Sequence, residues 1–144
     1  MQKTIQIKYH TNQEKLTFIE GKSDWIDLRA SKTYVLKKGD FAMIDLGVSM
    51  KLPEGYEAHV VPRSSTFKKW GVIQTNGTGV IDNSFSGTGD VWKMPVLATR
   101  DTRIIEGDRI CQFRITKKQP DIMFEEVDTL DDVNRGGFGS TGTR

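Results

Sequence analysis

Apolar and polar residues alternate in short runs along most of the chain. In the stretch TIQIKYH, Ile5, Ile7 and Tyr9 fall on one face of an extended strand. The same alternation places Ala58 with Val60 in YEAHVV and Cys111 with Phe113 in DRICQFRIT. Turn-forming sequences such as KKGD, LPEG, TNGTG and IEGD lie between these runs. Many short strands separated by turns predict an all-β sandwich or barrel.

One stretch does not alternate. The sequence SSTFKKWG, residues 64–71, starts with serines that suit a helix N-cap and ends on Gly71, so it predicts one or two helical turns. The glycine-rich end of the chain follows neither pattern. We therefore expect a single β-domain over residues 1–128 and a flexible C-terminal arm over residues 129–144.

Composition narrows the class of protein. The 144 residues are 36% hydrophobic and 28% charged, as in one globular domain, and the net charge of +2 is too small to indicate nucleic acid or a membrane as the main partner. The single cysteine, Cys111, excludes an internal disulfide and fits a reducing compartment. No run approaches the ~18 apolar residues of a membrane span, so we expect a cytoplasmic protein.

The stretch VVPRSST holds the first candidate anion site. Arg63 offers a planar charged fork, and Ser64 and Ser65 offer hydroxyl donors at a predicted helix start, where backbone N–H groups lack partners. Such groups suit phosphate oxygens. The alternative is a serine that only caps the helix beside a surface arginine, and this stretch alone leaves both open.

The stretch TNGTGVIDNSFSG holds a candidate general base. Gly77 and Gly79 predict a tight hairpin whose backbone can approach a ligand, and Asn76 adds a donor and an acceptor. Asp82 follows two β-branched residues, where a carboxylate is unusual unless it faces a pocket and takes a proton from an attacking water. The alternative is an aspartate that caps a turn with Ser84.

Two single residues and the tail add weaker signals. Asp27 in WIDLRAS could reach the water shell of a metal, and Gln112 in EGDRICQFRI could donate to a phosphate, but either could be an ordinary turn or strand residue. The tail NRGGFGSTGTR combines arginine and hydroxyl groups with a phenylalanine plate. It suits a lid that orders over an anionic, ring-bearing ligand, against the alternative of a frayed terminus.

Taken together, these stretches resemble the trimeric dUTP pyrophosphatases, the dUTPases, in the compact form of their phage and Gram-positive branch. They occur in the family's order: DLRA at 27–30, PRSS at 62–65, GVIDNSFSG at 79–87, GDRICQ at 107–112 and RGGFGSTG at 135–142. The related dCTP deaminases share the barrel, but the five stretches with the tail favour a dUTPase.

The resemblance implies a fold and a reaction. The fold is a distorted jelly-roll β-barrel with one short helix after PRSS, and three chains form a homotrimer with shared active sites. The reaction is the hydrolysis of dUTP to dUMP and pyrophosphate with Mg²⁺, which keeps uracil out of DNA and supplies dUMP for dTMP synthesis. A member of the family could instead grip a protein partner as a regulator, but no insert in this sequence indicates one.

The resemblance also implies roles by motif position. Asp82 is the general base for the water that attacks the α-phosphorus, and Asp27 contacts Mg²⁺ through water. Asn76 and the backbone of Gly79–Ile81 read the uracil edge. Phe85 stands where the family usually has tyrosine and packs on the deoxyribose.

The remaining substrate-binding residues hold the phosphates or close the site. They are Arg63, Ser64, Ser65 and Gln112 and, from the arm, Arg135, Phe138, Gly139, Ser140 and Thr141. Arg135 stands three residues before Phe138, closer than the family's usual five, and Trp92 interrupts a normally apolar strand. Trp92 therefore either shares the lid role of Phe138 or lies in the core or at a contact between chains.

Overall fold

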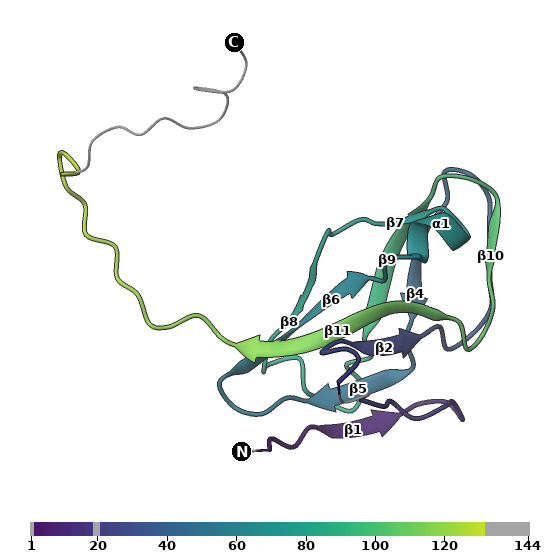
Figure 1. Ribbon diagram of the computed structural model, residues 1–144, viewed down its shortest axis with the longest axis horizontal. Coiled ribbons are helices and arrows are strands. Elements are labelled where there is room, and N and C mark those ends of the chain that lie inside the picture. Colours follow the sequence, from purple (N-terminus) through teal and green to yellow (C-terminus); the bar gives the residue numbers. More distant parts are fainter. Residues whose placement is uncertain (1, 19–20, 132–144) are drawn as a thin grey trace, which may run out of the picture.

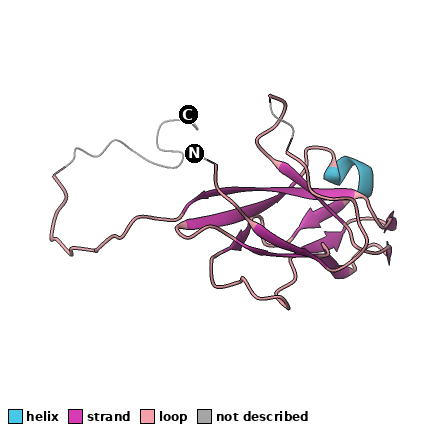
Figure 2. Cartoon of the chain, turned by 90° about the horizontal axis from the view of Figure 1, so that it is seen from below, coloured by secondary structure: helices cyan, strands magenta, loops and turns pink. Residues whose placement is uncertain are grey.

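Strands make up most of the chain, together with one short helix (Figures 1 and 2). The computed structural model describes residues 2–18 and 21–131. Within these residues the strands are β1 (Gln6–Tyr9), β2 (Ile26–Arg29), β3 (Tyr34–Leu36), β4 (Phe41–Asp45), β5 (Val48–Lys51), β6 (Tyr56–Pro62), β7 (Val72–Gln74), β8 (Gly79–Ile81), β9 (Lys93–Ala98), β10 (Thr102–Ile104) and β11 (Arg109–Lys117), and the helix is α1 (Thr66–Trp70). The prediction of an all-β protein with one short helix is confirmed.

The long strand β11 lies inside the largest sheet. It pairs antiparallel with β2 on one side and with β6 on the other, and β6 pairs with β8, which gives the order β2-β11-β6-β8. The other described sheets are β4-β9-β7, β1-β5 and β10-β3. No two bonded neighbours in these sheets are consecutive strands, so the chain crosses between sheets as in a jelly roll and not as a series of hairpins.

Alternation along β6 and β11 sorts side chains between the core and the surface. Ala58 and Val60 of β6 and Cys111 and Phe113 of β11 are buried, as the sequence pattern predicts. Burial, with a smaller contribution from the charge of Asp27, raises the pKa of the Cys111 thiol. The thiol stays protonated and unreactive, so this cysteine is a core residue.

Trp92 lies in the core and not over a site. Its side chain is fully buried, and its ring meets that of Phe113 edge-on, with 5.2 Å between the ring centroids. Its backbone is also held, because the Trp92 N–H donates to the Val48 carbonyl at 2.8 Å. Moving a ring of about 200 Å² into water would cost on the order of 5 kcal/mol. Of the roles that the sequence left open, the structure supports the core role and contradicts the lid.

The helix α1 begins without the serine cap that the sequence predicts. Ser65 occupies the N-cap position but makes no side-chain bond to the helix. Thr66 fixes the turn instead, because its Oγ1 accepts from the Arg63 N–H at 2.9 Å and donates to the Ile110 carbonyl at 3.0 Å. The helix has only five residues and ends at Gly71 with a left-handed φ of 65°. So short a helix has little dipole, and anion binding here must depend on side chains.

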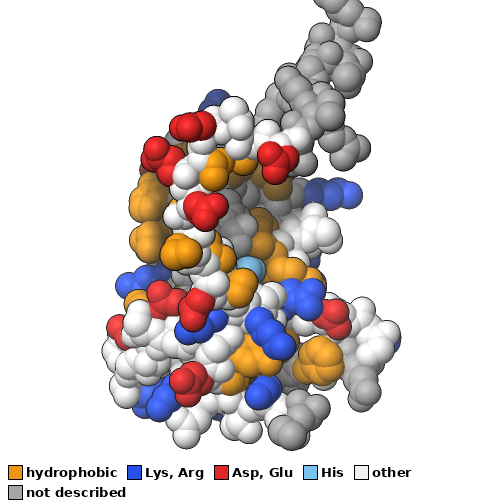
Figure 3. Space-filling model, turned by 90° about the vertical axis from the view of Figure 1, so that its left-hand side faces the viewer, with side chains coloured by type: hydrophobic (Ala, Val, Ile, Leu, Met, Phe, Trp, Pro, Cys, Tyr) orange, Lys and Arg blue, Asp and Glu red, His pale blue; other side chains and the backbone are white. Residues whose placement is uncertain are grey.

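The chain leaves the sheets after β11. The Lys118 N–H donates to the Gly55 carbonyl at 2.9 Å, and residues 119–131 then lead away from the body (Figure 1). Met123 and Phe124 in this segment are 88% and 91% exposed, and hydrophobic side chains are visible at this end of the molecule (Figure 3). The exposed run thus begins before residue 129, where the sequence predicted the arm to start.

The predicted closing residues lie outside the described part of the chain. These residues are Arg135, Phe138, Gly139, Ser140 and Thr141. Their roles stay predictions. No helix among the described residues has the length and apolar character needed to cross a membrane.

Candidate active site

Polar side chains project from one face of the four-stranded sheet where β2 meets β11. In the register of these strands, Asp27 lies opposite Gln112, which in turn lies opposite Val61 of β6. Their neighbours Leu28 and Cys111 point the other way and are fully buried. Because side chains alternate along a strand, Asp27 and Gln112 stand together on the outer face.

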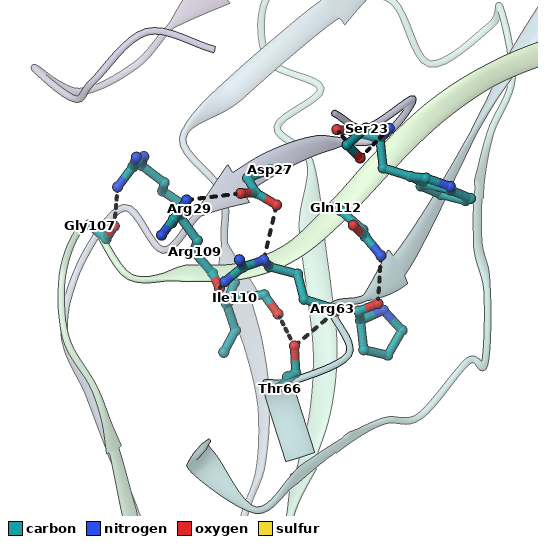
Figure 4. A network of polar contacts seen from close by, with 11 residues as sticks. Ser23, Asp27, Arg29, Arg63, Thr66, Gly107, Arg109, Ile110 and Gln112 are labelled. Carbon is teal, nitrogen blue, oxygen red and sulfur yellow. Dashed lines mark hydrogen bonds and ion pairs between the residues drawn. The ribbon is translucent and has the colours of Figure 1, made fainter. Parts of the chain in front are cut away.

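Two arginines share the Asp27 carboxylate (Figure 4). Arg63 Nε lies 3.0 Å from Asp27 Oδ1, and Arg109 Nη1 lies 3.4 Å from Asp27 Oδ2. Arg63 Nη1 also donates to the Arg109 carbonyl at 3.2 Å. Since two positive groups share one negative group, the cluster keeps a positive charge and can accept an anion.

Short contacts fix the turn that carries Arg63. Gln112 Nε2 donates to the Pro62 carbonyl at 3.2 Å, and Thr66 ties the Arg63 N–H to the Ile110 carbonyl (Figure 4). The turn after β6 is therefore bound to β11 at two points. Side chains that start from so rigid a turn are well placed to hold a ligand in one orientation.

A cavity of about 290 Å³ lies beside these groups. Its wall carries one carboxylate, that of Asp27, and five cationic side chains among the described residues. The cationic side chains are Lys15, Lys22, Arg29, Arg63 and Arg109. Ser64 and Gln112 also line it. The excess of positive charge makes an anion the preferred occupant. The structure thus brings together Asp27, Gln112 and the pair Arg63 and Ser64, which the sequence had picked out in three separate stretches.

The candidate base follows β8. Asp82 Oδ1 accepts from the Ser84 N–H at 2.8 Å and from Ser84 Oγ at 2.5 Å, and these bonds, the hydroxyl first, lower the pKa of Asp82. The side chain is exposed, and Ile81 and Phe85 line the hollow beside it. Asp82 is therefore charged near neutral pH. It makes the predicted turn with Ser84 and still presents a carboxylate to solvent.

The segment between β7 and β8 holds Asn76 beside a residue that the sequence analysis missed. Gln74 is buried, and its Nε2 donates both to the Val60 carbonyl and to Asn76 Oδ1, at 2.9 Å each. Gly77 adopts a φ of 69°, and a Cβ on Gly79 would lie 3.3 Å from that of Val60. The left-handed φ favours glycine at position 77, and a side chain at position 79 would require Val60 to shift slightly. Alternation did contain a signal for Gln74, which shares the inward face of β7 with a buried valine.

Asp27 and Asp82 belong to opposite edges of the same sheet. β2 forms one edge and β8 the other, with β11 and β6 between them. At a spacing of about 4.8 Å per strand, three steps separate the edges by roughly 14 Å. The hollow of Asp82 and the cavity of Asp27 share no lining residue. One chain therefore does not bring its own Asp82 to its own Asp27 and Arg63.

Asp27 fits a metal that arrives with a phosphorylated ligand better than a resident one. In the part of the chain that the structure describes, no group of three or more His, Cys, Asp or Glu side chains could hold a metal ion. Mg²⁺ commonly binds through one or two carboxylates, several waters and substrate phosphates. Because both Asp27 oxygens already contact arginines, a contact with Mg²⁺ through water suits this carboxylate.

Comparison with known sequences gives a consistent picture. The dUTPase family model matches residues 22–142. The SPbeta prophage-derived deoxyuridine 5'-triphosphate nucleotidohydrolase YosS of Bacillus subtilis (strain 168) is 57% identical over 141 residues, which cover 97% of this chain and 99% of that protein.

Solved structures show the same fold. A variant of the dUTPase of Staphylococcus bacteriophage 80alpha with dUpNHpp has a TM-score of 0.81 at 20% identity, over 99% of this chain and 100% of that one. A variant of the dUTPase of phage phi11 of S. aureus, described with a structural Mg(II) ion, has a TM-score of 0.75 at 18% identity, over 90% and 100% of the two chains. The predicted jelly-roll barrel is confirmed.

Proposed function

The chain belongs to the dUTPase family and hydrolyses dUTP to dUMP and pyrophosphate, and we propose that Asp82 activates the water that attacks the α-phosphorus. The reaction removes a precursor of uracil in DNA and supplies dUMP for dTMP synthesis, and we place it in the cytoplasm. One observation carries the choice of base. Asp82 is an exposed carboxylate that stays charged near neutral pH.

The geometry of the Asp82 turn supports this role. Both bonds from Ser84 go to Oδ1, which leaves Oδ2 open to a water molecule. As the water oxygen bonds to the α-phosphorus, the bond from that phosphorus to the bridging oxygen breaks. Asp82 takes one proton of the water, and pyrophosphate leaves with the bonding electrons.

A homotrimer completes each site in this proposal. The separation of the Asp82 hollow from the Asp27 cavity within one chain supports it, since the two halves must meet on one substrate. A neighbouring chain that places its own β8 edge over the cavity would join them. Val80 and Phe85 line the same hollow and are both exposed, and together they form an apolar surface that suits cover by another molecule.

In this proposal the segment before Asp82 binds the uracil end of the substrate. Asn76 and the backbone of Gly79–Ile81 read the base edge, and Gly79 lies so close to Val60 that a side chain at position 79 would crowd it. Phe85 packs on the deoxyribose. A flat ring pressed against this face leaves no space for a 2′-hydroxyl, which excludes UTP.

The cavity beside Asp27 and Arg63 binds the phosphate end of the substrate. Arg63, Ser64 and Gln112 bind the phosphate chain, with Ser65 behind them at the helix start, and the surplus positive charge of the cavity supports this assignment. Asp27 would hold Mg²⁺ through water, and the ion, bound with the triphosphate, would neutralise charge on the leaving pyrophosphate.

The C-terminal arm closes the site in the same proposal. Arg135, Ser140 and Thr141 clamp the outer phosphates, and Phe138, next to Gly139, covers the base. The exposed course of the chain after β11 supports an arm that reaches beyond its own body. With Trp92 in the core, Phe138 is left as the aromatic lid.

Pyrophosphate release tests the proposed function. Wild-type protein is assayed with dUTP, UTP, dTTP and dCTP, each with and without Mg²⁺. We expect release from dUTP far faster than from the other three nucleotides, and dependent on the metal. Release from UTP at a comparable rate would contradict the role of Phe85, and ammonia from dCTP would show a deaminase instead.

A further inference from the structure

Gln74 is a buried polar residue with no place in the roles assigned so far. It ends β7, shares the inward face of that strand with Val72, and is only 5% exposed. Its Oε1 has no hydrogen-bond partner among the described residues. Leaving a buried amide oxygen unpaired is unfavourable, and an apolar residue of similar size would avoid that cost. A role in packing alone therefore explains the amide poorly.

The contacts of Gln74 fix the direction of its amide. The Val60 carbonyl can only accept a hydrogen bond, so the atom that faces it at 2.9 Å must be Nε2. The second hydrogen of Nε2 is directed to the side chain of Asn76, again at 2.9 Å. That side chain must present its oxygen to Gln74. The Val60 carbonyl thus fixes the orientation of the Gln74 amide, and the Gln74 amide fixes that of Asn76.

The consequence is a fixed hydrogen-bond donor at the end of this relay. Because Oδ1 of Asn76 is held by Gln74, its Nδ2 points elsewhere, and it lies 3.5 Å from the position that a Cβ would take on Gly79. Asn76 itself is exposed. The donor is thus presented to solvent beside the first residue of β8, where the proposed function places the base.

We propose that Gln74 is a positioning residue that makes the site select uracil over cytosine. The inference rests on the proposed function, in which Asn76 reads the base edge. Uracil carries a carbonyl oxygen at C4, whereas cytosine carries an amino group there. A fixed Asn76 Nδ2 donates a hydrogen bond to the uracil oxygen. The cytosine amino group is itself a donor, so it cannot accept this hydrogen bond. An asparagine free to turn over would offer its oxygen to cytosine and lose this discrimination.

The test separates the orientation of Asn76 from packing. In Gln74→Met the side chain keeps its size and loses both donors. We expect the ratio of kcat/KM for dUTP to kcat/KM for dCTP to fall by roughly tenfold or more. Inhibition constants of dUMP and dCMP should move in the same sense, because they report binding without turnover. Gln6→Met, on the exposed strand β1, is the matched control and should leave the ratio unchanged.

A second variant, Asn76→Asp, removes the difference between the two orientations of the side chain at position 76. A carboxylate has two equivalent oxygens, so Asn76→Asp presents an acceptor whichever way it turns. We expect this variant to shift preference toward dCTP, and we expect Gln74→Met added to it to have no further effect on the ratio. This double-mutant cycle isolates the part of the effect that passes through Asn76.

Two results would overturn the inference. One is that Gln74→Met lowers kcat/KM for dUTP and for dCTP by the same factor. The other is that Gln74→Met lowers the ratio equally whether residue 76 is asparagine or aspartate. Either would show that Gln74 acts through packing. These results differ from failure of the proposed function, in which the wild-type protein releases no pyrophosphate from dUTP.

Discussion

The phosphate cavity and the Asp82 turn are built in different ways. In the cavity, Asp27 is shared by Arg63 and Arg109, which come from distant parts of the chain and meet through the register of β2 and β11. Asp82 makes its side-chain bonds to Ser84, two residues away, on an exposed turn. The binding half is thus fixed by long-range contacts inside one chain. The Asp82 turn is held by a local contact, and in the proposed trimer a neighbouring chain covers it.

The largest effect should follow from loss of the base. Asp82→Asn keeps the shape of the side chain and the acceptor for Ser84, but it removes proton acceptance. We expect turnover to fall by roughly 10²–10⁴, with little change in binding of a non-hydrolysable dUTP analogue. Pyrophosphate release and calorimetric titration measure the two quantities. Asp101→Asn, which keeps the acceptor for a backbone N–H in a distant turn, is the control. Near-normal turnover of Asp82→Asn would remove this residue from the mechanism.

Mixing two defective variants tests whether the halves meet between chains. Arg63→Ala removes a charged hydrogen-bonding group and should lower kcat/KM by roughly tenfold to a hundredfold. If each site takes Asp82 from one chain and Arg63 from another, random trimers of Arg63→Ala with Asp82→Asn regain about one quarter of the wild-type sites.

The recovery experiment has a clear opposite result. The two variants carry different tags, are unfolded and refolded together, and are assayed at low dUTP concentration. Activity that stays at the average of the separate variants would mean that one chain supplies both residues. The comparison between the halves would then need another explanation.

Trp92 packs in the core against the strand that carries Gln112. Its ring packs on Phe113, which follows Gln112 along β11. Trp92→Ala should therefore lower the free energy of unfolding by about 3–5 kcal/mol, as for other large aromatic residues removed from a core. Chemical denaturation measures the loss. Phe67→Ala, on a side chain that is 55% exposed, should change the stability far less.

The same variant distinguishes the core from a lid. At a temperature where Trp92→Ala remains folded, KM for dUTP should stay close to the wild-type value. A rise in KM without loss of stability would return Trp92 to the substrate site.

Local sequence pattern predicted much of the fold and part of the site. Alternation located β6 and β11 and their buried residues, because the period of two is a property of the strand itself. The short helix was expected in the right place, but its start depends on Thr66 bonding to Ile110. That contact joins residues far apart in sequence, and no local rule contains it.

The positions of the site residues relative to one another needed the structure. The motifs picked out Asp27, Arg63 and Asp82 by chemistry, yet only the sheet order shows that the first two are neighbours and the third is not. Trp92 and Gln74 illustrate the same limit. A tryptophan that interrupts a normally apolar strand suits a lid until its packing is known. A glutamine that ends an apolar run matters only through the residue that it contacts.

The smallest expected effect is a shift in the pH dependence of the reaction when the Asp82 turn loses one hydrogen bond. Ser84 lowers the pKa of Asp82, first through its hydroxyl and then through its N–H. A lowered pKa keeps the carboxylate charged, and so able to act as a base, down to more acidic pH. Ser84→Ala removes the hydroxyl and keeps the N–H, so the pKa should rise part of the way toward its ordinary value.

The acid limb of the kcat/KM profile should then move to higher pH, while activity near neutral pH, well above either pKa, changes little. Ser84→Thr retains a hydroxyl and should restore the wild-type profile, and Ser86→Ala is a neighbouring control. The profile is measured from about pH 2.5 to 7, which includes the range below the ordinary pKa of an aspartate. An acid limb that does not respond to Ser84→Ala would show that a group other than Asp82 sets it. Since the hydroxyl bond is local, its effect should be the same in the mixed trimers as in the wild type, which separates the chemistry of the turn from the assembly that covers it.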